Sequence, residues 1–287
     1  MPRPVHPNST DVDATPARAA VGKLDARVFA SDGKAVIVAL DHALASGQLA
    51  PLDRPVPLLS RVVAGNPDGL ILTAGMGRLP DAARVPWFLT ADYYATSVFP
   101  GAVGEDDLHV MAWDVGGARD FGATGVKCLL VFGRSDPRQL ERNVASVARL
   151  TTEAHRAGLS VMIEATLWGP RIGSARQHDA TMVAHAARVA FELGADVIKI
   201  PLPDDLDALG RLAEALPVPI VVMGGPAGRP ERLFLEVEQA MAAGVRGVAL
   251  GRNVWQAPDP AAYVGALRAL VHDGVSAPEA LERLRAV

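Results

Sequence analysis

The chain has 287 residues, of which 49% are hydrophobic, so it can bury a large core, and its formal net charge is -4. Without a basic excess we expect no nucleic-acid partner, and no apolar run reaches the roughly 18 residues of a membrane span, so we expect no membrane association. The single cysteine, Cys128, excludes an internal disulfide. Because the N-terminus also lacks the apolar core of a signal peptide, we expect a cytoplasmic protein.

Eight short apolar runs recur along the chain after an N-terminal tail. Residues 1–20 are rich in Pro, Ser, Thr and Asp and predict a flexible tail, which leaves residues 21–287 as the folded domain. The runs are continuous rather than alternating, as is typical of parallel strands that are buried on both faces. In chain order they comprise residues 35–40, 69–73, 87–90, 125–131, 160–165, 196–200, 219–223 and 247–250.

Segments with helical spacing separate these runs. Residues 143–157 and 181–193 each place small or aliphatic side chains on one face, as amphipathic helices do, and residues 277–287 predict a final helix. Several helices are followed by a glycine just before the next run, where a left-handed residue commonly ends a helix. These glycines are Gly158, Gly194 and Gly244.

The repeated alternation of strand and helix predicts an α/β fold, a closed (β/α)8 TIM barrel in a single domain. A doubly wound open sheet is the alternative, and it is disfavoured because no GxGxxG motif opens an early helix. Two connections, residues 75–86 and 93–107, are irregular and longer than usual. In a barrel, long loops after strands lie at the catalytic face.

A lysine, Lys199, stands in the middle of the sixth apolar run. Side chains alternate along a strand, so Lys199 points into the barrel if Ile198 and Ile200 pack outward against the helices. A buried neutral amine is a nucleophile that attacks a carbonyl and forms a Schiff base. The alternative is a lysine that extends from the strand end to pair with Asp204 or Asp205, and Lys199 alone does not separate the two interpretations.

A second lysine in an apolar run, Lys127, favours the chemical interpretation. Two inward lysines in one barrel are costly unless carboxylates stand near them, and Asp41 and Glu164 are the carboxylates available at strand ends. Two lysines and two acids around one cavity can form an imine and move protons on and off carbon and oxygen. A purely structural network of two ion pairs is the alternative.

Glycine-rich turns follow the last two predicted strands. Gly224 and Gly225 follow one strand, and Gly251 with Arg252 follows the other. Barrels often bind phosphate at these two loops, where backbone N–H groups favour an anion and Arg252 would add a charged hydrogen bond. The alternative is that these glycines merely form tight turns.

Two further side chains at strand ends are candidates for substrate binding. Trp168 follows the fifth strand, and His42 follows the first, where it either orients Asp41 or caps a turn. No HxH or HExxH cluster occurs, so we expect no metal site.

With these residues in place, the chain resembles the class I, Schiff-base aldolases of the (β/α)8 type that are grouped with deoxyribose-phosphate aldolase. The stretches GKAVIVALDHALASG at 33–47 and ALGRNVWQ at 249–256 resemble archaeal-type fructose-bisphosphate aldolases. The Val-Lys pair that ends at Lys127 and the Ile-Glu pair that ends at Glu164 are closer to tagatose-bisphosphate and sulfofructose-phosphate aldolases. The DVIKI pattern at 196–200 is shared with both branches.

The resemblance extends over residues 20–275 and implies roles for the matching positions. Lys199 would form the Schiff base, and Lys127 would favour its neutral amine and bind a substrate oxygen. Asp41 would hold or deprotonate substrate hydroxyls, and Glu164 would relay protons. The resemblance also implies that a phosphate is held by Gly225, Gly251 and Arg252.

The turn after the fifth strand departs from the archaeal-type pattern. Those aldolases place a tyrosine, their general acid, just before a Pro-Arg-Gly turn, whereas Gly169 stands at that place here, followed by Pro170 and Arg171. Either Glu164 carries the work of that tyrosine or the reaction differs.

The sequence therefore predicts a metal-independent class I aldolase with no organic cofactor. It would bind a phosphorylated ketose or dihydroxyacetone phosphate as a lysine Schiff base and make or break a C–C bond. One alternative is a Schiff-base transferase or synthase of the aminoquinate-precursor or acyl-transfer type, and another is a non-catalytic barrel that binds a phosphorylated ligand. Because barrels of this family commonly self-associate, we expect a homo-oligomer.

Overall fold

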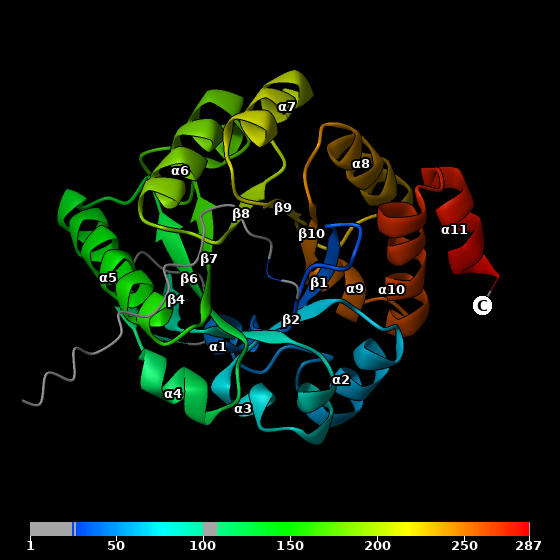
Figure 1. Cartoon of the computed structure of the whole chain (residues 1–287), viewed down its shortest axis with the longest axis horizontal. Helices are drawn as coiled ribbons and strands as arrows, with labels where there is room; N and C mark the ends of the chain where they lie inside the picture. The colour runs from blue at the N-terminus through cyan, green and yellow to red at the C-terminus, as the bar shows by residue number, and fades with distance from the viewer. Residues whose placement is uncertain (1–24, 26, 100–107, 287) are drawn as a thin grey trace, which may run out of the picture.

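Eight parallel strands close into a barrel in the computed structural model, which describes residues 25, 27–99 and 108–286 (Figure 1). The strands follow one another around the barrel in the order β1-β10-β9-β8-β7-β6-β3-β2. They are β1 (Ala35–Ala39), β2 (Gly69–Leu72), β3 (Trp87–Thr90), β6 (Gly125–Val131), β7 (Ser160–Thr166), β8 (Val197–Pro201), β9 (Ile220–Met223) and β10 (Gly247–Leu250). The predicted (β/α)8 TIM barrel is confirmed, and the predicted strands agree with the observed ones to within one residue at either end. The tail predicted for residues 1–20 lies outside the described residues.

Helices surround the barrel on its outside, as Figure 1 shows. The longer ones are α2 (Pro55–Ala64), α5 (Pro137–Arg156), α6 (Ala180–Glu192), α7 (Leu206–Ala215), α8 (Pro230–Ala242), α10 (Pro260–Arg268) and α11 (Ala277–Arg285). Shorter segments are α1 (Ala43–Ser46), α3 (Ala74–Gly77), η1 (Pro80–Arg84), α4 (Val115–Asp120), η2 (Ser174–Arg176), α9 (Arg252–Trp255) and the π-helical turn η3 (Ala269–Asp273). None of the helices in the described ranges is long and apolar enough to cross a membrane.

The three predicted helices correspond to α5, α6 and α11. Helix α5 begins earlier than predicted, because Pro137 opens its first turn and the side chain of Asp136 accepts a hydrogen bond from the N–H of Arg138. The predicted helix stops are confirmed by positive φ angles of 71°, 88° and 94° at Gly158, Gly194 and Gly244 respectively.

The region after β3 corrects one prediction. Residues 93–107 were expected to be an irregular loop, but residues 93–95 belong to β4 (Asp92–Ala95), which pairs with β5 (Leu108–Met111) as a separate two-stranded antiparallel sheet. Residues 100–107 of this connection lie outside the described residues. The sequences of β4 and β5, DYYA and LHVM, lack the continuous apolar run that marked the four-residue strands of the barrel, which is why the sequence did not reveal them. The other irregular connection, residues 75–86, contains the end of α3 and the short helix η1.

Alternation along the strands sorts their side chains into two cores. The outer core lies under the helices and includes Ile198 and Ile200, whereas the inner core fills the barrel and includes Val197. The predicted orientation of β8 is therefore confirmed, and Lys199, two residues beyond Val197, points into the barrel.

Candidate active site

Five polar side chains form the next layer of the barrel interior, toward the carboxyl ends of the strands. Each lies two residues beyond a position of the inner layer, because side chains repeat every second residue along a strand. Written with the inner position first and the polar side chain second, the five pairs are Ala39 with Asp41, Phe88 with Thr90, Gly125 with Lys127, Met162 with Glu164, and Val197 with Lys199. The structure thus brings together the four predicted ionisable residues at the end of the barrel where such folds place their chemistry.

Glu164 lies between the two lysines. Its Oε2 atom is 3.0 Å from Nζ of Lys199 and 2.8 Å from Nζ of Lys127. The three side chains are only 7%, 6% and 4% exposed, respectively. Asp204 and Asp205 do not pair with Lys199, because they accept hydrogen bonds from backbone N–H groups at the starts of α6 and α7.

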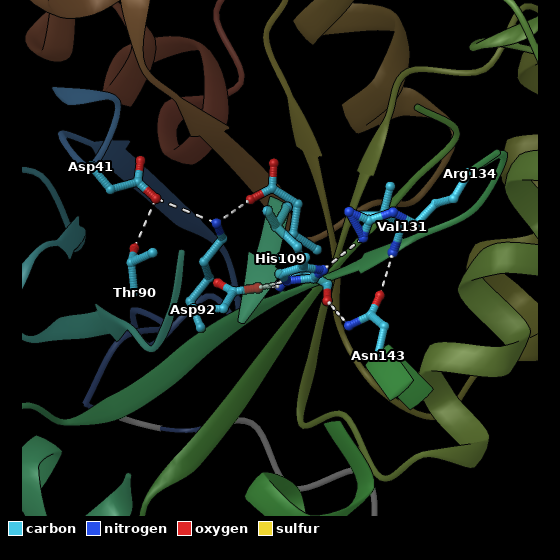
Figure 2. A network of polar contacts seen from close by, with 10 residues as sticks. Asp41, Thr90, Asp92, His109, Val131, Arg134 and Asn143 are labelled. Atoms are coloured by element: carbon cyan, nitrogen blue, oxygen red, sulfur yellow. Dashed lines mark hydrogen bonds and ion pairs between the residues drawn. The ribbon is translucent and has the colours of Figure 1, made fainter. Parts of the chain in front are cut away.

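Asp41 completes the cluster from the end of β1. Its Oδ2 atom lies 3.3 Å from Nζ of Lys127 and accepts a 2.8 Å hydrogen bond from the hydroxyl of Thr90, as Figure 2 shows. Burial by itself would raise the pKa of Asp41, but the opposing charges, led by Lys127, outweigh burial and hold that pKa well below its usual range. Asp41 is therefore a carboxylate at neutral pH.

Lys127 and Glu164 are also held in their charged forms. Burial alone would lower the pKa of Lys127, yet the carboxylates of Glu164 and Asp41 outweigh it and raise that pKa. Burial alone would raise the pKa of Glu164, but the charges on Lys127 and Lys199 outweigh it and lower that pKa. The residues that the structure describes include no group of three or more His, Cys, Asp or Glu side chains placed to hold a metal ion.

His42 and Gly251 pack against each other beside this cluster. Nδ1 of His42 lies 3.5 Å from Oδ1 of Asp41 without hydrogen-bond geometry, and its ring meets Trp255 edge-on at 5.4 Å. Burial lowers the pKa of His42, so its imidazole is neutral at pH 7. A Cβ on residue 251 would collide with that imidazole, which explains the glycine.

A cavity of about 770 Å³ lies at the carboxyl ends of β7 to β10. Its lining includes the predicted binding residues Trp168, Gly224, Gly225 and Arg252. His42, Gly251 and the four ionisable residues of the cluster are not among its lining residues. The structure therefore divides the predicted site into a buried reactive cluster and an open binding cavity.

The side of the cavity between β9 and β10 suits an anion. Asn253 fixes its loop, because Nδ2 donates to the carbonyl of Gly225 at 3.4 Å and Oδ1 accepts from the N–H of Gly228 at 3.2 Å. The 13-residue helix α8 begins at Pro230 beside this loop, so its N-terminal dipole favours negative charge there. The arginines that line the cavity are Arg229, Arg232 and Arg252.

A buried polar chain that the sequence did not reveal ties the β4–β5 sheet to the barrel (Figure 2). Oδ2 of Asp92 accepts the backbone N–H of residue 129 at 2.7 Å and lies 2.7 Å from Nε2 of His109. Nδ1 of His109 is 3.0 Å from Nη1 of Arg134. Because a guanidinium only donates, His109 carries its proton on Nε2 and donates to Asp92. Asn143 extends this support by accepting from the N–H of Val131 at 2.9 Å.

Trp168 is braced at the cavity wall by the same sheet. Its indole stacks on Tyr94 of β4 with ring centroids 5.9 Å apart and an interplanar angle of 26°. The guanidinium of Arg134 lies over the Tyr94 ring, 5.1 Å from its centroid. The short antiparallel sheet therefore supports the cavity wall from outside the barrel.

The turn after β7 has no room for a side chain at residue 169. Gly169 has a φ of 128°, and a Cβ there would collide with the carbonyl oxygen of Gly133 in the loop after β6. The N–H of Arg171 donates to the same carbonyl at 3.0 Å. Residue 169 is therefore restricted to glycine, since the two loops touch through their backbones.

Comparisons with known proteins agree with this geometry. A family model described as DeoC/LacD family aldolase matches residues 35–257. The chain is 33% identical over 239 residues to the 2-amino-4,5-dihydroxy-6-oxo-7-(phosphonooxy)heptanoate synthase of Streptomyces griseus, which covers 83% of this chain and 84% of that protein. It is 31% identical over 267 residues to a class 1 fructose-bisphosphate aldolase of Halobacterium salinarum, covering 88% and 96% of the two chains.

A solved structure gives a similar result. An archaeal fructose-1,6-bisphosphate aldolase, captured with its catalytic lysine covalently bound to the carbinolamine intermediate of the substrate, matches with a TM-score of 0.77 at 27% identity. The match covers 88% of this chain and 99% of that one.

Proposed function

Because the chain belongs to the DeoC/LacD family of aldolases, we propose that it uses Lys199 to form a Schiff base with a phosphorylated ketone. The observation that carries this proposal is that one carboxylate oxygen, Oε2 of Glu164, is shared by the amino groups of Lys199 and Lys127. Lys127 contacts a second carboxylate, Asp41, which holds it as an ammonium. Lys199 contacts Glu164 alone among the described carboxylates, so it is the better nucleophile of the two.

In the first step, the amine of Lys199 attacks the carbonyl carbon of the ketone, and the carbinolamine loses water to give an iminium. Glu164 accepts the proton that leaves Nζ and returns one to the departing hydroxyl, because its Oε2 lies 3.0 Å from Nζ. Lys127 stays charged and donates a hydrogen bond to a substrate oxygen.

In the second step, the bond between the α and β carbons breaks. Its electron pair moves toward the iminium nitrogen to give an enamine, while the β-hydroxyl loses its proton to Glu164 and leaves as an aldehyde. Protonation of the enamine carbon and hydrolysis then release the ketone and regenerate Lys199. Asp41 holds the substrate hydroxyls, because it contacts Lys127 and Thr90 rather than Nζ of Lys199.

The proposed donor is dihydroxyacetone phosphate, either free or as the ketone half of a phosphorylated ketose. Its phosphate would lie on the loop of Gly224 and Gly225, at the start of α8, with Arg252 as a charged partner. Three arginines line the cavity against two carboxylates, Asp204 and Glu236, which favours an anionic ligand.

The direct test is borohydride reduction in the presence of dihydroxyacetone phosphate, followed by intact mass measurement and peptide mapping. The chain has four lysines, at positions 23, 34, 127 and 199, so the modified residue is identified without ambiguity. We expect one reduced adduct on Lys199. An adduct on Lys127 would reassign the nucleophile, and no adduct with any ketone would favour a non-catalytic phospho-ligand-binding barrel.

A second candidate function, an aldolase-type synthase, is favoured by Gly169. By the resemblance, Gly169 stands where archaeal-type fructose-bisphosphate aldolases have their tyrosine acid, and a side chain there would collide with Gly133. The name of the Streptomyces griseus product divides at one C–C bond into a dihydroxyacetone phosphate half and a four-carbon amino-acid aldehyde. Both candidates share the donor, so product analysis with glyceraldehyde 3-phosphate and with aspartate semialdehyde distinguishes them.

A further inference from the structure

His178 lies on the wall of the cavity, in the connection between β7 and α6, and the proposed mechanism does not use it. Its Nδ1 atom is 2.7 Å from the carbonyl oxygen of Leu202, just after β8. Its own carbonyl accepts the N–H of Asp204 at 2.8 Å, and Oδ1 of Asp204 accepts the N–H of Ala180 at 3.0 Å. These contacts fasten the connections after β7 and β8 to each other and fix the position of His178.

The contact with Leu202 decides which ring nitrogen carries the proton. A carbonyl oxygen only accepts hydrogen bonds, so Nδ1 of His178 is the donor. In the neutral imidazole, Nε2 then holds a lone pair and acts as an acceptor. Among the described residues, no hydrogen-bond partner of this Nε2 atom is present. Because His178 is exposed on the cavity wall, this Nε2 atom is accessible to a ligand in the cavity as well as to solvent.

We propose that Nε2 of His178 accepts a hydrogen bond from a hydroxyl group of the acceptor aldehyde, and that the cavity is built for hydroxylated acceptors. This inference rests on the proposed aldol chemistry. The cavity runs from Trp168 and His178, beside β7 and β8, to Gly225 and Arg252, beside β9 and β10. With the donor phosphate on the glycine loop, the acceptor half of the substrate lies toward His178.

Charge explains why the group that meets Nε2 of His178 is a hydroxyl rather than a phosphate. Asp204 lines the cavity two residues after Leu202 and is fastened to the backbone of His178. Its carboxylate repels a nearby anion, whereas a neutral hydroxyl both tolerates it and supplies the proton that Nε2 accepts. Gln177, which also lines the cavity, adds a second neutral polar contact.

The variant His178→Asn separates anchoring from ligand binding. The amide nitrogen of asparagine occupies the place of Nδ1, so it retains the donor to Leu202, but nothing replaces Nε2. The probes are dihydroxyacetone phosphate as the donor and, as acceptors, D-glyceraldehyde and propanal, which share a three-carbon chain and differ in their hydroxyl groups. We expect kcat/KM for D-glyceraldehyde to fall about three- to tenfold in His178→Asn, as for the loss of one neutral hydrogen bond, with propanal unchanged.

Each other outcome overturns the inference. Equal losses with both aldehydes would make His178 a structural residue, and no loss with either would show that it does not touch the acceptor. Wild-type protein that forms the reduced adduct on Lys199 but condenses neither aldehyde would refute the acceptor class and leave the proposed function standing. Wild-type protein that forms no adduct would refute the proposed function and the inference together. Unfolding curves that coincide for the wild type and the variant confirm that the anchor to Leu202 is retained.

Discussion

Glu164 and Lys199 are register partners on β7 and β8, and the hydrogen-bonded sheet itself sets the 3.0 Å contact between their carboxylate and amine. Both residues lie two positions beyond apolar partners that fill the barrel, Met162 and Val197, so the core below holds the pair in place. Lys127 reaches the same carboxylate oxygen from β6 at 2.8 Å. One carboxylate and two amino groups therefore meet within one layer of side chains.

Replacing Glu164 with glutamine should slow the reaction and destabilise the fold. The amide cannot carry a proton between Nζ of Lys199 and the substrate, so we expect kcat to fall by about 100-fold or more, with a much smaller change in KM. The buried Lys127 ammonium would lose one of its two carboxylates and Lys199 would lose its only one among the described residues, which costs about 3 kcal/mol of unfolding free energy. Steady-state kinetics and denaturant unfolding measure the two effects.

The control for this variant is Glu192→Gln, which removes an exposed carboxylate that pairs with Arg188 on α6. It should change the unfolding free energy by less than about 1 kcal/mol, because exposed ion pairs contribute little. A Glu164→Gln effect confined to KM would argue against a proton-transfer role.

The pKa of Glu164 is lowered in the folded state. The stability that this carboxylate contributes is therefore present above its pKa in the unfolded chain, and it is lost as the pH falls through its pKa in the folded protein.

The two lysines should differ in borohydride trapping. Lys199→Met removes the proposed nucleophile, so the reduced adduct should disappear and turnover should fall on the order of 10⁴-fold or more. Lys127→Met removes an equally buried ammonium beside the same carboxylate and should leave an adduct on Lys199 that forms more slowly. Peptide mapping of both variants checks that Lys199 is the modified residue. Retained turnover in Lys199→Met would refute its role as the nucleophile.

Gly169→Ala should destabilise the protein, since the added methyl collides with the carbonyl of Gly133 and φ is 128°. We expect a loss of about 3 kcal/mol of unfolding free energy, from backbone strain and overpacking together. Gly265→Ala is the matched control, because that Cβ meets nothing within 4 Å and lies within α10. Alanine there should stabilise the helix by up to about 1 kcal/mol. Equal stability of the two variants would contradict the proposed contact between the loops.

His272 should make the stability of the protein depend on pH. Its Nδ1 is 2.8 Å from Asp32 and its Nε2 is 2.8 Å from Asp68, on the amino-terminal side of the barrel. The pKa of His272 is raised, and the hydrogen bond to Asp68 makes the largest contribution to this increase. A pKa raised on folding contributes stability that is fully present below the unfolded value of about 6.5 and is lost as the pH rises through the folded value.

His272→Gln should therefore unfold more easily than the wild type near pH 6, by about 1–2 kcal/mol, since charged hydrogen bonds contribute this much and Asp32 is partly exposed. Denaturant unfolding across a pH series should show this difference closing in the alkaline range. His185→Gln on α6 serves as the control. A difference between the wild type and His272→Gln that stays constant with pH would show that the imidazolium is not what holds the two carboxylates.

Local patterns in the sequence determined the barrel and the reactive cluster. Continuous apolar runs predicted the eight strands, and alternation alone placed Lys199 and Val197 on one face and Ile198 and Ile200 on the other. Because all parallel strands end at one rim, polar residues at strand ends had to converge there, and Lys199, Lys127, Glu164 and Asp41 do so.

Only the tertiary structure decided the partners and the wall of the cavity. The contacts of His109 with Asp92, and of His178 with Leu202, join segments 17 and 24 residues apart through connections with no periodic pattern. Likewise, residue 169 must be glycine because a Cβ there would collide with Gly133, which lies in the loop after the neighbouring strand β6. Sequence periodicity predicts which face of a strand or helix a residue occupies. Contacts between loops depend instead on the positions that the loops take when the barrel packs, and no local pattern specifies those positions.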